Sequence, residues 1–139
     1  DGTVDLDTAG ATVASAVIKT AGKETIWVPA AAMRPTVSNP CSDIVSVETT
    51  SGRPDMNVLD FDTTADEFAQ FAVAFPNSWN LGTITFQAFW SGIAATTDCD
   101  WSLQGVAMIG RDVSGDNMNG DARLHGIKLF FTTNSTNDA

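Results

Sequence analysis

The sequence predicts an all-β protein, an antiparallel β-sandwich of two sheets. Segments in which apolar and polar residues alternate are separated by clusters of turn-forming residues, which is the pattern of short strands. Gly, Thr, Ser and Asn are plentiful among the 139 residues, whereas long runs of Leu, Glu and Lys are missing. This bias favours strands and turns over helices. Roughly six to eight short strands without a helix indicate two packed sheets.

The expected strands cover most of the chain after the N-terminal segment. In chain order they are residues 23–30, 43–50, 57–62, 67–75, 83–90, 101–109 and 123–133. In the first strand, Ile26 and Val28 face one way and Trp27 the other, because successive side chains of a strand point to opposite faces. In the third strand, Val58 lies opposite Leu59 for the same reason.

Two aromatic-rich strands in the middle of the chain are expected to supply the core. Residues 67–75, EFAQFAVAF, also contain good helix formers, so a helix is the rival interpretation there. Residues 83–90, TITFQAFW, alternate strictly and fit a strand far better than a helix. The residues expected in the core are Phe71, Phe75, Ile84, Phe86 and Trp90.

Length and charge indicate one domain with an acidic surface. Residues 1–18 lack alternation and large side chains, so we expect an N-terminal arm that only a neighbouring molecule holds in place. Residues 19–139 are expected to form a single β-sandwich domain. Seven Lys and Arg against 17 Asp and Glu give a net charge of −10, which argues against nucleic acid and anionic membranes as partners. No stretch approaches the roughly 18 apolar residues of a membrane span.

The chain has two cysteines, Cys41 and Cys99, and their spacing matches no zinc or redox motif. Both lie in turn-rich stretches, SNPCSD and TTDCDW. A disulfide that joins two loops at one end of the sandwich is one interpretation. Two free thiols, as in a cytosolic protein, are the other.

Candidate catalytic residues are few. His125 is the only histidine, so any Ser–His or Cys–His site must include it. It alternates with Ile127, Leu129 and Phe131 and is expected on their face of the last strand, where a structural or surface role is the simpler interpretation. A glycosidase needs two carboxylates, but acidic residues between strands are also common in turns. The candidate carboxylates are Asp60, Asp62, Asp66 and Glu67.

The loop RDVSGDNMNGD is the candidate metal site. Its oxygen donors, of the kind that calcium accepts, are Asp112, Asp116, Asn117, Asn119 and Asp121. Relative to an EF-hand with Gly120 as the turn glycine, an acid is missing at Gly115 and a glutamate at Gly126. A solvated turn is the favoured interpretation, and neither a metal ion nor another cofactor is expected.

Trp79 lies in the turn PNSWNLG between the two aromatic-rich strands. A tryptophan in such a turn either covers the end of the sandwich or contacts a ligand, and both alternatives stay open. The chain contains no GxSxG, P-loop or dinucleotide-binding motif. The sequence therefore predicts a protein that is not an enzyme.

Several of these segments, taken in order, resemble a family of virion structural proteins of tailed bacteriophages that is abundant among marine phages. The similar segments are KETIWVPAAAMRP, LDFDTTADEFAQFAVAFPNSWNLGTITFQAFW, WSLQGVA and GDARLHGIKLFFTTNSTNDA, and the resemblance covers residues 15–139. Family members often carry a longer insertion where this chain has only MIGRDVSGDNMNG. Any host recognition carried by that insertion is lost or moved here.

The resemblance implies a non-enzymatic β-sandwich of jelly-roll type on the virion, as a capsid decoration, a head fibre or a domain of a tail fibre. It also implies a homo-oligomer, with a trimer favoured, in contact with other virion proteins such as the major capsid protein. The expected contacts are the N-terminal arm and one exposed sheet face, with Phe68 and Phe89 as apolar anchors. The alternative function is a carbohydrate- or host-receptor-binding module of a phage fibre, in which Trp79 contacts a host surface glycan.

Overall fold

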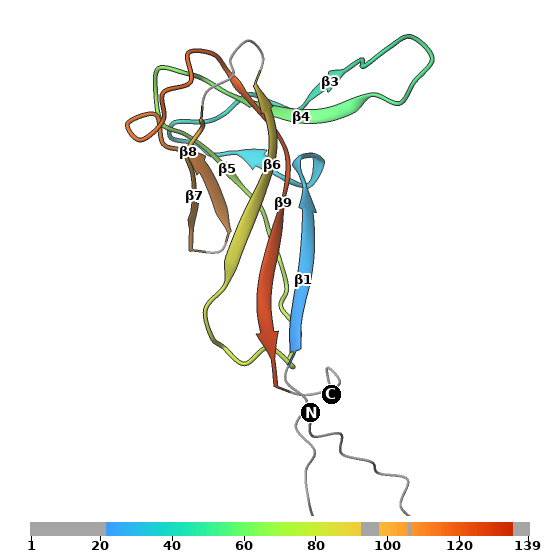
Figure 1. Ribbon diagram of the computed structural model, residues 1–139, viewed down its shortest axis with the longest axis vertical. Helices are drawn as coiled ribbons and strands as arrows, with labels where there is room; N and C mark the ends of the chain where they lie inside the picture. Colours follow the sequence, from blue (N-terminus) through green and yellow to red (C-terminus); the bar gives the residue numbers. More distant parts are fainter. Residues whose placement is uncertain (1–21, 93–97, 106, 135–139) are drawn as a thin grey trace, which may run out of the picture.

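The computed structural model describes residues 22–92, 98–105 and 107–134 and confirms an all-β architecture of two antiparallel sheets (Figure 1). The elements are β1 (Gly22–Pro29), η1 (Ala30–Ala32), β2 (Arg34–Pro35), β3 (Val45–Val47), β4 (Met56–Phe61), β5 (Glu67–Gln70), β6 (Thr85–Gly92), β7 (Trp101–Gln104), β8 (Met108–Arg111) and β9 (Ala122–Thr133). Among the described residues, no helix has the length and hydropathy to span a bilayer. The expected arm, residues 1–18, lies outside the described residues.

The five-stranded sheet is built around β9, whose 12 residues make it the longest described strand. One side of β9 pairs with β6 along most of its length, and the other side pairs with β1 and then with β4, beyond which lies β3. Figure 1 shows β1 and β9 reaching down together to one end of the molecule, where β1 begins and β9 ends. We call this the terminal end. The four-stranded sheet has the order β2-β5-β8-β7. The jelly-roll connectivity stays a prediction.

The core lies between the two sheets, where apolar side chains from both sheets pack into one cluster. Its largest members with 0% exposure are Phe61, Leu59, Ile109, Leu124, Ile127 and Leu129. Aromatic rings join the two sheets. Trp101 of β7 meets Phe61 of β4 at a centroid distance of 5.0 Å and Trp90 of β6 at 6.3 Å. The aromatic stretch of β6 therefore contributes to the sheet interior.

The expected core residues follow the predicted strand faces. Phe71 is buried, and the other four, Phe75, Ile84, Phe86 and Trp90, are partly buried against the core cluster. On β1, Val28 is buried while Trp27 is exposed on the opposite face. These positions confirm the alternation that the sequence predicts for residues 23–30 and 83–90.

Three predicted strands are wrong in length. The strand expected over residues 43–50 is only the three-residue β3, Val45–Val47. The strand expected over residues 67–75 ends at Gln70, because β8, its partner in the sheet, is itself only four residues long. Residues 71–84 continue as an irregular connection. The strand expected over 101–109 is instead a hairpin of β7 and β8, which turns at Gly105 with a positive φ of 56°, a conformation that glycine adopts without strain.

Candidate functional site

The outer face of the five-stranded sheet is the candidate functional site. Alternate residues of β1, β6 and β9 point away from the core, and the pairing places them in cross-strand rows. The rows are Lys23 with Thr132, Thr25 and Thr85 with Phe130, and Trp27 and Gln87 with Lys128. Phe89 lies beside Gly126 in the next row. The face thus combines exposed aromatic rings with hydroxyl, amide and ammonium groups.

Trp27 and Phe89 form an exposed aromatic pair on this face. Their ring centroids lie 5.2 Å apart with an edge-to-face angle of 80°, and the residues are 50% and 41% exposed. Gly126 makes this packing possible, because a Cβ at that position would lie 2.5 Å from Cζ2 of Trp27. Met56 and His125 also line the shallow hollow of about 460 Å³ around the pair. We call Trp27, Met56 and Phe89 the apolar patch.

His125 lies on this outer face, and the prediction that it shares a face with Ile127, Leu129 and Phe131 is wrong. The pairing of β6 with β9 shifts between Phe89, opposite Gly126, and Trp90, opposite Leu124. The shift leaves His125 as the extra residue of a β-bulge, so the alternation reverses there. Sequence periodicity carries no signal for such an insertion.

The His125 imidazole contacts Ser91, with 2.9 Å between Nε2 and Ser91 Oγ. Burial, helped by the charge of Arg123, lowers the pKa of His125 below its ordinary value and so favours the neutral ring. A serine within hydrogen-bond reach of a histidine meets one requirement of a nucleophilic site. The second requirement is a group that orients the base. Asp60 lies opposite Arg123 in the pairing of β4 with β9, and its carboxylate accepts from Arg123 Nε at 3.2 Å.

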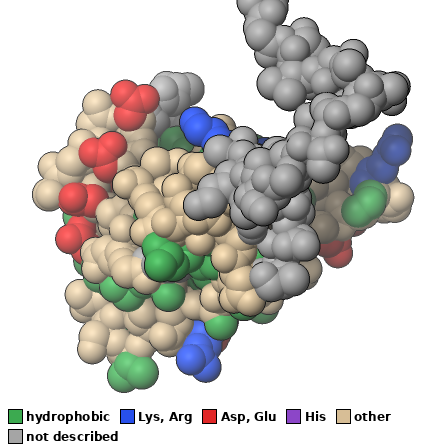
Figure 2. Space-filling model, turned by 90° about the horizontal axis from the view of Figure 1, so that it is seen from below, with side chains coloured by type: hydrophobic (Ala, Val, Ile, Leu, Met, Phe, Trp, Pro, Cys, Tyr) green, Lys and Arg blue, Asp and Glu red, His purple; other side chains and the backbone are tan. Residues whose placement is uncertain are grey.

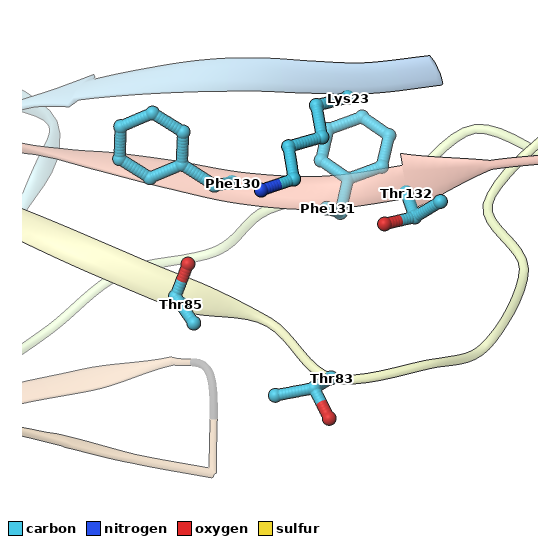
Figure 3. A pocket seen from close by; sticks show the side chains of 6 residues that line it. All are labelled: Lys23, Thr83, Thr85, Phe130, Phe131 and Thr132. Atoms are coloured by element: carbon cyan, nitrogen blue, oxygen red, sulfur yellow. The ribbon is translucent and has the colours of Figure 1, made fainter. Parts of the chain in front are cut away.

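A second hollow of about 360 Å³ opens at the terminal end of the same face, and we call it the terminal groove. Its lining residues are Lys23, Thr83, Thr85, Phe130, Phe131 and Thr132. Figure 3 shows Lys23 extending from β1 across β9, toward the side on which Thr85 lies. The Lys128 ammonium is 5.3 Å from the centroid of the Phe130 ring, so two lysines flank this ring.

The candidate carboxylates serve the turns in which they lie. Asp62 accepts from the backbone N–H and hydroxyl of Thr64, and these hydrogen bonds lower its pKa. Asp66 accepts from Val113 N at 2.9 Å. Glu67 accepts from Asp62 N at 2.8 Å, while burial raises the pKa of Glu67. Each of these contacts is a turn or loop contact of the kind expected of acidic residues between strands.

The candidate metal loop is organised by a buried arginine that sequence reasoning missed. Arg111 donates from Nε to Asp116 Oδ2 at 2.7 Å and from Nη2 to Asp116 Oδ1 at 3.2 Å. Both oxygens of the Asp116 carboxylate thus accept from Arg111, and Asp112 accepts from the neighbouring Ser114. Within the described ranges, no group of three or more His, Cys, Asp or Glu side chains is placed to hold a metal ion.

Both cysteines are free thiols, Cys41 buried and Cys99 partly buried. Burial is the main cause that raises the pKa of each thiol to about 12. At neutral pH both are therefore protonated and poor nucleophiles. This arrangement corresponds to the free-thiol alternative.

Trp79 covers the core at the terminal end. Its ring lies 4.9 Å from that of Phe75, which in turn meets Phe131 at 5.3 Å. Trp79 also forms an isolated antiparallel bridge with Thr133 of β9, and its indole nitrogen is buried. This is the geometry of the lid alternative, and a ligand contact by Trp79 stays a prediction.

Charge is unevenly distributed over the face seen in Figure 2. Figure 2, a view toward the terminal end, shows acidic side chains gathered along one side of the molecule, while apolar side chains gather nearer its middle.

Comparison with models of known protein families, with curated proteins and with solved structures gives no match.

Proposed function

We propose that the protein is a non-enzymatic structural protein on the surface of a tailed-phage virion and that it assembles as a homo-oligomer through the apolar patch. The observation that carries the assembly proposal is the exposed pair of Trp27 and Phe89, 50% and 41% exposed, with Met56 at 38% beside them. Exposed apolar patches of this kind on folded proteins mark interaction surfaces, and tryptophan is enriched among the residues that dominate binding energy. The virion location rests on the sequence resemblance.

A second copy of the same chain is the proposed occupant of the patch. With a net charge of −10, two copies repel each other over most of their surfaces. The outer face of the five-stranded sheet reduces this repulsion, because Lys23 and Lys128 lie on it and Asp60, its acidic residue on β4, is paired with Arg123. The apolar patch of one copy contacts either the same patch or an adjacent surface of the next copy. Repeating the same contact in every copy gives a symmetric oligomer.

The assembly contact differs in one respect from the sequence expectation. Phe68 belongs to β5 of the four-stranded sheet, and Phe89 to β6 of the five-stranded sheet. Phe68 packs over Gly110, and a Cβ added at Gly110 would lie 2.4 Å from Cδ1 of Phe68. The two phenylalanines therefore cannot anchor one common sheet face. We retain Phe89 and replace Phe68 by Trp27.

The experiment is sedimentation velocity on the full chain at micromolar concentration. The expected result is an oligomer, with a trimer favoured, that dissociates when Trp27→Ser and Phe89→Ser are combined. Leu81→Ser is the matched control, because Leu81 is 81% exposed and lies outside the patch. The control variant should remain oligomeric, and thermal unfolding should show that both variants are folded. A monodisperse monomer of the unaltered chain that also fails to decorate phage particles would overturn the proposal.

A further inference from the structure

The terminal groove carries three hydroxyl groups that no other described residue engages. The side chains of Thr83, Thr85 and Thr132 line the groove, and none of their hydroxyls hydrogen-bonds to another described residue, although Thr132 O accepts from Asn80 N at 2.9 Å. Each hydroxyl can both donate and accept. Three such groups around one hollow match a ligand that itself carries several hydroxyl groups.

The Phe130 ring supplies an apolar surface beside these hydroxyls (Figure 3). It lies in the same cross-strand row as Thr85, one position along the outer face from Thr132 and Lys23. A pyranose ring has an apolar C–H face and a rim of hydroxyls, so it can lie on the aromatic ring and hydrogen-bond at its edge. The hollow of about 360 Å³ lies in the range of small-molecule sites.

The charge around Phe130 favours an anionic ligand. Lys23 lines the groove and Lys128 lies over the ring, and neither ammonium forms an ion pair with a described residue. Two of the chain's seven Lys and Arg thus lie in the rows on either side of Phe130 without an ion-pair partner among the described residues. A carboxylate on the ligand would neutralise Lys23 through a charge-assisted hydrogen bond.

We propose that the terminal groove binds one carboxylated pyranose, a sugar of the uronic acid class. Its ring lies on Phe130, its hydroxyls hydrogen-bond to Thr83, Thr85 and Thr132, and its carboxylate contacts Lys23. This site is separate from the apolar patch of Trp27, Met56 and Phe89 and does not depend on assembly. A virion surface protein with such a site would contact acidic polysaccharide of a host cell.

The experiment is an NMR titration of the isotope-labelled full chain with four methyl glycosides. Methyl glucuronoside and methyl galacturonoside carry the carboxylate, and methyl glucoside and methyl galactoside carry a CH₂OH group in its place. The uronides should shift the signals of Thr83, Thr85, Phe130 and Thr132, and their binding should weaken with added salt. Lys23→Gln should weaken uronide binding by about three- to tenfold, and Thr85→Val by about two- to fivefold.

Matched controls lie in the connection between β3 and β4, away from the groove. Arg53→Gln removes the same charge and Thr50→Val the same hydroxyl at exposed positions, and neither should change uronide binding. The proposal is overturned if no glycoside shifts the groove signals, if neutral and acidic sugars bind equally, or if Lys23→Gln acts no more strongly than Arg53→Gln. Trp27→Ser with Phe89→Ser should leave uronide binding unchanged, which separates this site from the proposed assembly surface.

Discussion

Arg111 is the charged residue with no exposed surface in the described part of the chain. Besides Asp116, its guanidinium donates to four backbone carbonyl oxygens, those of Phe61, Asp62, Met118 and Gly120, at 2.9 to 3.2 Å. These contacts join the end of β4 to the loop between β8 and β9. A buried charge is tolerated when it is paired and hydrogen-bonded in this way. Arg111 therefore organises the loop that the sequence offers as a metal site.

Replacing Arg111 with methionine should lower the free energy of unfolding by about 3–5 kcal/mol. The change removes the guanidinium that neutralises the buried Asp116 carboxylate and takes the Arg111 hydrogen bond from four carbonyl oxygens, although Asp116 still accepts from Met118 N and Met118 O from Thr63 Oγ1. Chemical denaturation measures the loss. Arg123→Met is the control, because the Arg123–Asp60 ion pair keeps 29% and 22% side-chain exposure, and its loss should cost less than about 1 kcal/mol. Equal costs for the two variants would contradict the role assigned to Arg111.

Asp116 should make stability depend on pH in the acid range. The hydrogen bond from Arg111 is the main cause that lowers the pKa of Asp116, so the folded protein binds this proton less readily than the unfolded chain. The resulting stability is present above the unfolded pKa of about 3.9 and is lost as pH falls through the lower folded pKa. Urea unfolding between pH 6 and pH 2 should show a shallower acid loss for Asp116→Asn. The same slope as in the unaltered chain would contradict this assignment, and Asp55→Asn, at an exposed position, serves as the control.

At the scale of single elements, the bulge in the central strand β9 determines which of its residues face the core and which face outward. Before the bulge, Ala122 and Leu124 face the core, and after it Ile127 and Leu129 do so. Gly126 follows the extra residue and receives the Trp27 ring. The bulge thereby places His125 and the exposed aromatic pair next to each other on one face.

Gly126→Ala should destabilise the protein by about 1–3 kcal/mol, the usual cost of overpacking. The new Cβ would lie 2.5 Å from the Trp27 ring and 2.8 Å from the backbone oxygen of Val28. Because backbone contacts cannot relax by a rotamer change, β1 itself must shift. Gly22→Ala is the control in the same pair of strands, since its Cβ would meet only Thr133 Oγ1 at an ordinary 3.6 Å. Thermal unfolding compares the two, and an unchanged Gly126→Ala variant would count against the close packing.

The two faces of β6 should respond differently to truncation. Phe86 packs against the core cluster, whereas Gln87 is exposed on the outer face. Phe86→Ala should cost about 2–4 kcal/mol, below the range for a fully buried phenylalanine because Phe86 is only partly buried. Gln87→Ala should change stability by less than about 0.5 kcal/mol. Denaturant unfolding of both variants tests the strand assignment, which equal effects would contradict.

At the scale of the whole molecule, the two sheets differ in extent. The strands of the four-stranded sheet are two to four residues long, whereas β1 and β9 continue to the terminal end (Figure 1). There the irregular connection of residues 71–84 takes the place of the second sheet, with Val73, Phe75 and Ile84 against the core. The terminal groove lies on the opposite, outer face of this extension.

The thiols should report unfolding of the whole domain. With pKa values raised to about 12, neither Cys41 nor Cys99 should react appreciably with a disulfide reagent at pH 8 in the folded protein. Both should react in denaturant without a reductant, giving two thiols per chain. No reactive thiols under those conditions would show that the cysteines are bonded, contrary to the structure. A Cys41→Ser variant should retain one reactive thiol.

The sequence by itself determined the all-β class and the faces of its regular strands. Alternation over residues 23–30 and 83–90 assigns Val28, Phe86 and Trp90 to the core side, because the two-residue period of a strand is a local property. Tertiary structure alone decided where β5 ends, that His125 occupies a bulge, and that Arg111 is buried. Each of these outcomes depends on which distant strand lies alongside: β8 for β5, β6 for His125, and the end of β4 for Arg111. Pairing of this kind is non-local, so no window of sequence contains it. The same holds for the terminal groove, whose side chains come from β1, β9, the start of β6 and the connection before it.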